Sequence, residues 1–175
     1  MQRPQLEHVI RAAAAITGAA DIVVIGSQAL LGQFPDAPAD LLVSIEADVF
    51  TFRNPEDADL IDGSIGEGSP FHKTFGYYAH GVSEDTAILP TGWKDRLVAV
   101  RNENTGHGRG LCLETHDLAV AKLAAGREKD IEFVSSLLRH KLAGARLIES
   151  RLRQTSLSGQ MLELALARLQ RLASA

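Results

Sequence analysis

The stretch DIVVIGSQALLGQFPDAPADLLVSIEADVF, residues 21–50, decides the fold, because it holds a strand, a glycine turn and two alternating acids. Its first part, Ile22 to Ile25, is a continuous apolar run typical of a strand buried on both faces. Gly26-Ser27 ends this strand, and a short helix is expected from Ser27, whose hydroxyl suits the N-cap, to about Gly32. The rest of the chain can be read as support for this segment.

A second strand is predicted from Leu41 to Phe50, where polar side chains alternate with apolar ones. Period two places Ser44, Glu46 and Asp48 on one face of this strand. Two carboxylates so close together repel each other unless a positive group lies between them, and a divalent metal ion is the usual one. Because the preceding glycine turn can present N–H groups to a phosphate, the stretch predicts a metal-dependent nucleotide site. A solvated face of an edge strand is the alternative.

A second informative stretch, DLAVAKLAAGREKDIEF, spans residues 117–133. It predicts a helix that carries Lys122 as a lone charge, a break at Gly126, and a further helix that begins near Arg127. A lone Lys on an apolar helix either extends to solvent or reaches into a polar site. Arg127 and Lys129 can contact a phosphate or pair with Asp130 on the helix surface.

Taken together, these segments resemble the nucleotidyltransferase superfamily that includes DNA polymerase beta, in which a Gly-Ser turn precedes a strand of alternating apolar and acidic residues. Here that strand is Ile45-Glu46-Ala47-Asp48-Val49. The closer resemblance, from about Ala20 to Arg139, is to small bacterial nucleotidyltransferase-like proteins related to abortive-infection and toxin–antitoxin nucleotidyltransferases. It implies an α/β fold with a small mixed β-sheet, helices packed on it and a helical C-terminal portion.

The resemblance also implies roles for individual residues. Glu46 and Asp48 would be catalytic and would hold Mg²⁺ or Mn²⁺. The nucleotide would be bound by five residues, namely Gly26, Ser27, Lys122, Arg127 and Lys129.

A third carboxylate on a neighbouring strand is implied as well. Glu84 and Asp85 are the available acids, and Asp85 is favoured because it begins a strand predicted over residues 85–89. Capping of the hairpin turn is the alternative role for this residue. His80, on a strand predicted over residues 76–82, is a further candidate.

The composition is that of a globular protein. The chain has 175 residues, of which 45% are hydrophobic and 23% charged, enough for one core with a helical appendage. We therefore expect a core over 1–139 and a C-terminal helical extension of the same domain over 140–175. The sequence shows no membrane-length apolar run and no signal-peptide pattern, and it has a single cysteine, Cys112. A cytoplasmic location is expected.

Charge is distributed unevenly along the chain. The net charge of −4 argues against non-specific coating of nucleic acid. Residues 1–121 carry 8 Lys and Arg against 17 Asp and Glu, whereas residues 122–175 carry 10 against 5. An acidic site and a basic helical portion suit a ligand made of metal and nucleotide, although solvated helix faces would look the same.

The leading hypothesis is therefore metal-dependent transfer of NMP from an NTP to a hydroxyl of RNA, tRNA or protein. The resemblance implies a toxin–antitoxin or phage-defence setting, with an antitoxin or a second copy as partner. The alternative is a catalytically degenerate module that binds a nucleotide or partner as a regulator, and a metal-dependent hydrolase is a third hypothesis. The last helix carries an apolar stripe that either folds back on the core or contacts a partner.

Overall fold

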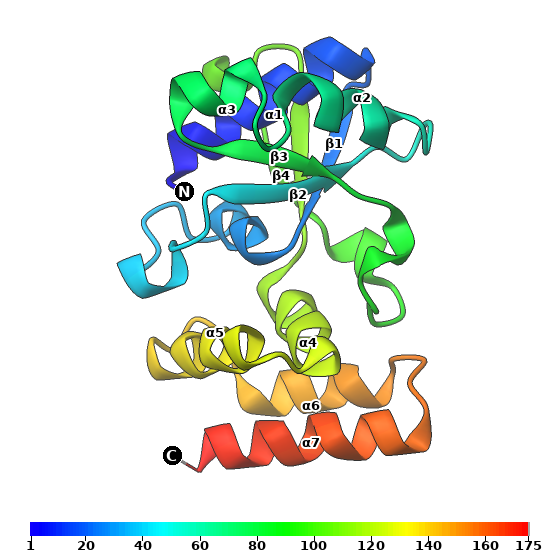
Figure 1. The fold of residues 1–175 in the computed structure, drawn as a ribbon. Coiled ribbons are helices and arrows are strands. Elements are labelled where there is room, and N and C mark those ends of the chain that lie inside the picture. The colour runs from blue at the N-terminus through cyan, green and yellow to red at the C-terminus, as the bar shows by residue number, and fades with distance from the viewer. Residues whose placement is uncertain (175) are drawn as a thin grey trace. The chain divides into compact units, whose positions relative to one another are not determined.

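A five-stranded mixed sheet organises the first part of the chain in the computed structural model, which describes residues 1–174. The strands are β1 (Asp21–Ile25), β2 (Glu46–Phe50), β3 (Tyr78–Gly81), β4 (Val98–Val100) and β5 (Arg109–Cys112). They lie in the order β3-β2-β1-β5-β4. Figure 1 labels β1 to β4 of this sheet. Strand β1 is central, antiparallel to β2 and parallel to β5, and its residues 22–25 are fully or almost fully buried. The predicted mixed sheet and buried first strand are confirmed.

Helices α1 (Arg3–Thr17) and α2 (Asp57–Ile65) cover one face of this sheet. A Cβ atom on Gly110 of β5 would lie 2.5 Å from Cδ1 of Ile10 in α1. A Cβ atom on Gly81 of β3 would lie 2.1 Å from the carbonyl oxygen of Ala58 in α2. The strand register places both glycines on the same face, so the absence of a side chain lets both helices approach. Side chains on the opposite face remain available for a site.

The second predicted strand is shorter than expected. Strand β2 begins only at Glu46, and residues 39–41 form a 3₁₀ turn instead. The side chain of Ser44 bonds locally to the backbone of Glu46, with 3.1 Å from the Glu46 nitrogen to Ser44 Oγ. Such bonds compete with strand pairing. Val43 is 77% exposed and Ile45 48%, so these two apolar residues of the expected alternation do not enter the core.

The strand predicted over residues 85–89 is absent. Residues Glu84–Thr86 form a 3₁₀ turn, and no regular element follows it until Trp93. The backbone nitrogen of Ser83 donates to Thr86 Oγ1 at 3.2 Å, and the Ser83 hydroxyl donates to the carboxylate of Asp85. These short-range bonds stabilise a turn, which explains why the apolar residues that follow do not continue as a strand.

Helices make up most of the second part of the chain. They are α4 (Thr115–Ala125), α5 (Glu128–Arg139), α6 (Ala145–Arg153) and α7 (Gly159–Ala173), and α7 packs against the other three. The segment 87–96 belongs with them, because Arg96 donates two hydrogen bonds to the fully buried carboxylate of Asp117. Arg151 of α6 donates to the same carboxylate at 2.9 Å. Two arginines on one buried acid hold this helical part together.

Contacts divide the chain into two units. The first comprises Met1–Thr86 and Leu97–Leu113, and the second comprises Ala87–Arg96 and Glu114–Ala175. The boundary between the units lies before α4, because α4 and α5 pack against the later helices of the second unit, α6 and α7. The expected core extended further along the chain, to residue 139. The assignment of 1–139 and 140–175 as parts of one domain stays a prediction. Among the described residues, no helix has the length and apolar character needed to cross a membrane.

Candidate active site

The pairing of β2 with β3 brings three potential metal ligands together. The parallel register pairs Glu46 with Tyr78 and Asp48 with His80, so all four side chains share the face opposite α1 and α2. Nδ1 of His80 lies 3.4 Å from Oε1 of Glu46 and 3.3 Å from Oδ1 of Asp48. Ligand atoms of Glu46, Asp48 and His80 all lie within 4.8 Å of one another. Two acids and an imidazole therefore converge on one point.

The glycine turn after β1 contacts this cluster directly. Gly26 has a φ of 70°, and a Cβ atom there would lie 2.1 Å from Oδ2 of Asp48. Only a glycine can take this conformation beside the carboxylate without strain. The turn continues into a 3₁₀ helix over Ser27–Gly32, whose N-cap is Gly26. The expectation that the Ser27 hydroxyl caps this helix is wrong, because the cap position falls on a residue without a side chain.

The two acids ionise unequally. Burial, followed by the hydrogen bond and the charge of Glu46, raises the pKa of Asp48 to about 6. Burial also acts to raise the pKa of Glu46, but hydrogen bonds with Tyr78 and Asp48 and the nearby His80 lower it overall. The Tyr78 hydroxyl donates to Oε2 of Glu46 at 2.7 Å, and this bond raises the pKa of Tyr78. Full ionisation of the pair is therefore costly without a cation.

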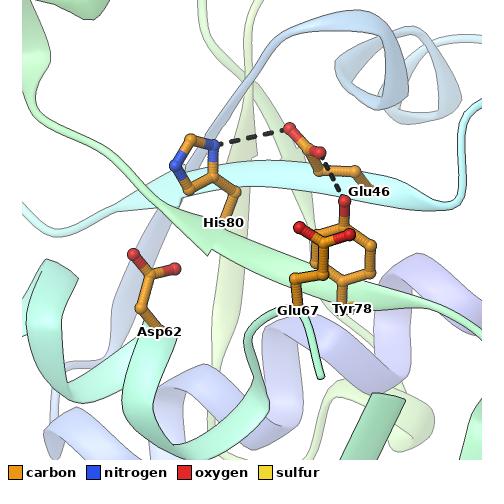
Figure 2. A pocket seen from close by; sticks show the side chains of 5 residues that line it. All are labelled: Glu46, Asp62, Glu67, Tyr78 and His80. Carbon is orange, nitrogen blue, oxygen red and sulfur yellow. Dashed lines mark hydrogen bonds and ion pairs between the residues drawn. The ribbon is translucent and has the colours of Figure 1, made fainter. Parts of the chain in front are cut away.

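An acidic pocket adjoins the cluster. It has a volume of about 380 Å³ and is lined by Glu46, Asp62, Glu67, Tyr78 and His80 (Figure 2). Asp62 comes from α2, and its Oδ1 accepts a hydrogen bond from the backbone of Gly81 at 2.7 Å. Three of the five lining residues are acids, so the pocket disfavours a bare anion.

Sequence reasoning named His80 only as a further candidate and missed Asp62, Glu67 and Tyr78. One signal was available, since Tyr78 and His80 are spaced by two residues, as are Glu46 and Asp48. That spacing puts each pair on one strand face. The sequence does not reveal the β2–β3 register that sets the pairs side by side.

Asp85 does not join the cluster. It lies in the exposed 3₁₀ turn Glu84–Thr86, where its carboxylate accepts the hydrogen bond from Ser83. The three-residue ligand group found among the described residues contains His80 and not Asp85. The choice of Asp85 rested on a strand that does not form, and its observed contact is that of a turn acid.

The three basic residues predicted to bind nucleotide lie in the second unit. Nζ of Lys122 is 3.0 Å from Oδ1 of Asp130 and 5.2 Å from the centre of the Phe133 ring. Nε of Arg127 lies 2.6 Å from Oδ2 of the same acid, which is fully buried. Burial acts to raise the pKa of Asp130, but bonds to Arg127 and Lys122 lower it overall.

These contacts give Lys122 and Arg127 a structural role. Lys129 is exposed. Nucleotide binding by the three residues stays a prediction.

A family comparison bears on this arrangement. Residues 4–167 match the family model described as "Nucleotidyltransferase of unknown function (DUF6036)", a range that includes segments of both units. No curated protein and no solved structure matches the chain.

The ion pair of Lys122 should contribute measurably to stability. Replacement Lys122→Met removes one of two charged partners of buried Asp130, and we expect the free energy of unfolding to fall by about 1.5–3 kcal/mol. Replacement Lys129→Met, at an exposed position in the next helix, α5, should change it by less than about 0.5 kcal/mol. Urea denaturation of the three proteins measures both effects. Equal stability of the Lys122 variant and the parent would contradict the structural role.

The raised pKa of Asp48 predicts a pH-dependent loss of stability in protein freed of divalent ions. The folded pKa of about 6 exceeds the ordinary value of 3.8, so the folded state holds an extra proton between these values. The stabilisation that this bound proton gives the folded state is fully present below pH 3.8 and is lost as the pH rises through 6. The parent should therefore lose stability relative to Asp48→Asn over this range, as measured by urea denaturation in EDTA. Parallel pH profiles of the two proteins would contradict the assignment.

Proposed function

We propose, from the premise that the chain belongs to the nucleotidyltransferase family DUF6036, that it transfers a nucleoside monophosphate from an NTP to a hydroxyl group. The observation that carries this proposal is the convergence of Glu46, Asp48 and His80 beside the Gly26 turn. In the reaction the hydroxyl oxygen bonds to the α-phosphorus, the bond to the β-phosphate oxygen breaks, and pyrophosphate leaves. The hydroxyl proton passes to water.

The residues present fit a divalent cation. Carboxylate oxygens are the protein ligands that Mg²⁺ and Mn²⁺ prefer, and the two acids of β2 are held where their mutual repulsion favours a cation between them. Glu46 and Asp48 would hold the ion. When bound, it would neutralise charge on the phosphates of the NTP.

Other residues of the first unit have supporting roles in this proposal. Gly26 leaves the space beside Asp48 open, because any side chain there would collide with the carboxylate. Ser27 follows it and offers a hydroxyl to a phosphate oxygen. Tyr78 orients Glu46 and favours its ionised form through the hydrogen bond that it donates. Binding and orientation of this kind are the main sources of catalysis in phosphoryl transfer.

Nucleotide binding by basic residues of the second unit is a separate part of the proposal, which the sequence alone supports. Lys122, Arg127 and Lys129 are the residues that the sequence marks for this role. Asp130 neutralises part of the charge of the first two. We therefore assign them a smaller contribution than the acids of β2.

Among the acceptors that the sequence leaves open, we favour a protein hydroxyl over RNA or tRNA. The divalent ion would offset the charge of the NTP, but each nucleotide of RNA brings a further phosphate, which the acids lining the pocket would repel. A serine, threonine or tyrosine side chain brings no such charge. A toxin–antitoxin or phage-defence setting, with an antitoxin or a second copy as partner, remains part of this proposal.

A second candidate function is a binding module without turnover. The observation that favours it is the position of His80, because its imidazole directly contacts both Glu46 and Asp48 at the place where a metal ion would bind. Such a protein would bind a nucleotide or a partner and act as a regulator.

Transfer of label tests the proposed function. The protein is incubated with each α-labelled NTP, Mg²⁺ or Mn²⁺, and separate RNA and protein fractions of a cell extract. We expect label on protein, and loss of more than about 100-fold of it in the variant Glu46→Gln/Asp48→Asn, which lacks both charges. The variant Glu56→Gln/Asp59→Asn, which removes two acids at the start of α2, is the matched control and should retain transfer.

Three other outcomes each count against part of the proposal. Label on RNA would overturn the acceptor assignment. Undiminished transfer by the Glu46 and Asp48 variant would overturn the site. Nucleotide binding without transfer in any fraction would favour the module.

A further inference from the structure

The third side chain of the ligand cluster is a histidine, where the superfamily resemblance implies an acid. Nδ1 of His80 lies 3.3 Å and 3.4 Å from carboxylate oxygens of Asp48 and Glu46. Adjacent ligands of an octahedral ion with bonds near 2.1 Å are separated by about 3 Å. The two separations from His80 are within a few tenths of an ångström of this value, so the imidazole lies near enough to both acids to share one ion with them, and His80 turns its ring toward Glu46 (Figure 2).

The backbone holds His80 in this position. Its strand partner is Asp48, and the next residue, Gly81, donates its N–H to Asp62 of α2 at 2.7 Å. Gly81 also packs against the backbone of Ala58 with no room for a side chain. Strand β3 is thus fixed both to β2 and to α2, so the imidazole is presented to the two acids by packed elements.

The chemistry of the donors then bears on which ion is preferred. Mg²⁺ is a hard ion that strongly prefers oxygen, whereas imidazole nitrogen suits first-row transition ions. Two carboxylates and one imidazole form a mixed set. Mn²⁺ accepts both kinds of donor, since it shares with Mg²⁺ the preference for carboxylate and water and is itself a transition ion.

We propose that His80 is the third protein ligand of the divalent ion and that it makes the site select Mn²⁺ over Mg²⁺. This inference rests on the proposed function in so far as it needs Glu46 and Asp48 to hold an ion. It goes further by assigning a nitrogen ligand and an ion preference. The competing role for His80 is that of a direct partner of the two acids that takes the place of the metal ion.

The test measures metal binding directly and does not require turnover. Titration of Mn²⁺ into the full chain, followed by electron paramagnetic resonance, gives its affinity, and competition gives that of Mg²⁺. Electron spin echo modulation then detects a ¹⁴N nucleus bound to Mn²⁺. The parent should bind Mn²⁺ more tightly than Mg²⁺ and should show the imidazole ¹⁴N signal.

Three variants make the assignment specific. His80→Ala should weaken Mn²⁺ binding by about tenfold or more, abolish the ¹⁴N signal and change Mg²⁺ affinity much less. His80→Asp should restore a third oxygen ligand and shift the preference toward Mg²⁺ without the ¹⁴N signal. His107→Ala, at an exposed histidine of the same unit outside the cluster, should behave as the parent. Urea denaturation verifies that all three are folded.

The outcomes separate this inference from the proposed function. Binding of Mn²⁺ that requires Glu46 and Asp48 but is unchanged in His80→Ala would overturn the inference and leave the proposed metal site intact. Absence of binding of either ion to the parent would overturn both. Tighter Mn²⁺ binding in His80→Ala than in the parent would show that His80 competes with the ion, which also overturns the inference.

Discussion

The electrostatic repulsion between Glu46 and Asp48 is the constraint on which the site depends. Strand alternation forces these carboxylates onto one face of β2, and burial makes the ionised form of Asp48 expensive. The surrounding structure provides partners for this charge. Tyr78 donates to Glu46, and His80 faces both acids. Gly26, on the other side of β2, leaves the Asp48 carboxylate room. Strand β3 and the turn that follows β1 thus both supply residues that lie against these two acids.

Much of the fold could be predicted because it follows from local patterns. The buried run of β1, the glycine turn after it and the same-face placement of Glu46 and Asp48 all depend on residues close together in the sequence. Two of the errors in strand bounds arose where side chains bond to nearby backbone. Ser44 delays the start of β2, and Ser83 and Thr86 stabilise a turn where a strand was expected. Apolar alternation alone does not reveal such competition.

The remaining features of the site depend on contacts between distant segments. His80 reaches Asp48 because β3 pairs with β2 in a particular parallel register across 32 residues of sequence, and neither strand encodes that register by itself. The same limit applies to Lys122 and Arg127. The sequence allowed Lys122 to extend to solvent or to reach a polar site, and it allowed Arg127 a phosphate contact or an ion pair. In the structure both pair with Asp130, and the burial of this acid makes the two ion pairs structurally important.

The central claim is that the β2–β3 register builds a metal site for nucleotidyl transfer. Anomalous diffraction from crystals grown with Mn²⁺ and a non-hydrolysable NTP analogue tests it most directly, because the signal at the manganese absorption edge locates the ion independently of any model of the protein. The account predicts an anomalous peak within bonding distance of Glu46, Asp48 and His80, with phosphate oxygens of the analogue completing its coordination. A peak elsewhere, or His80 in direct contact with both acids and no ion between them, would contradict it.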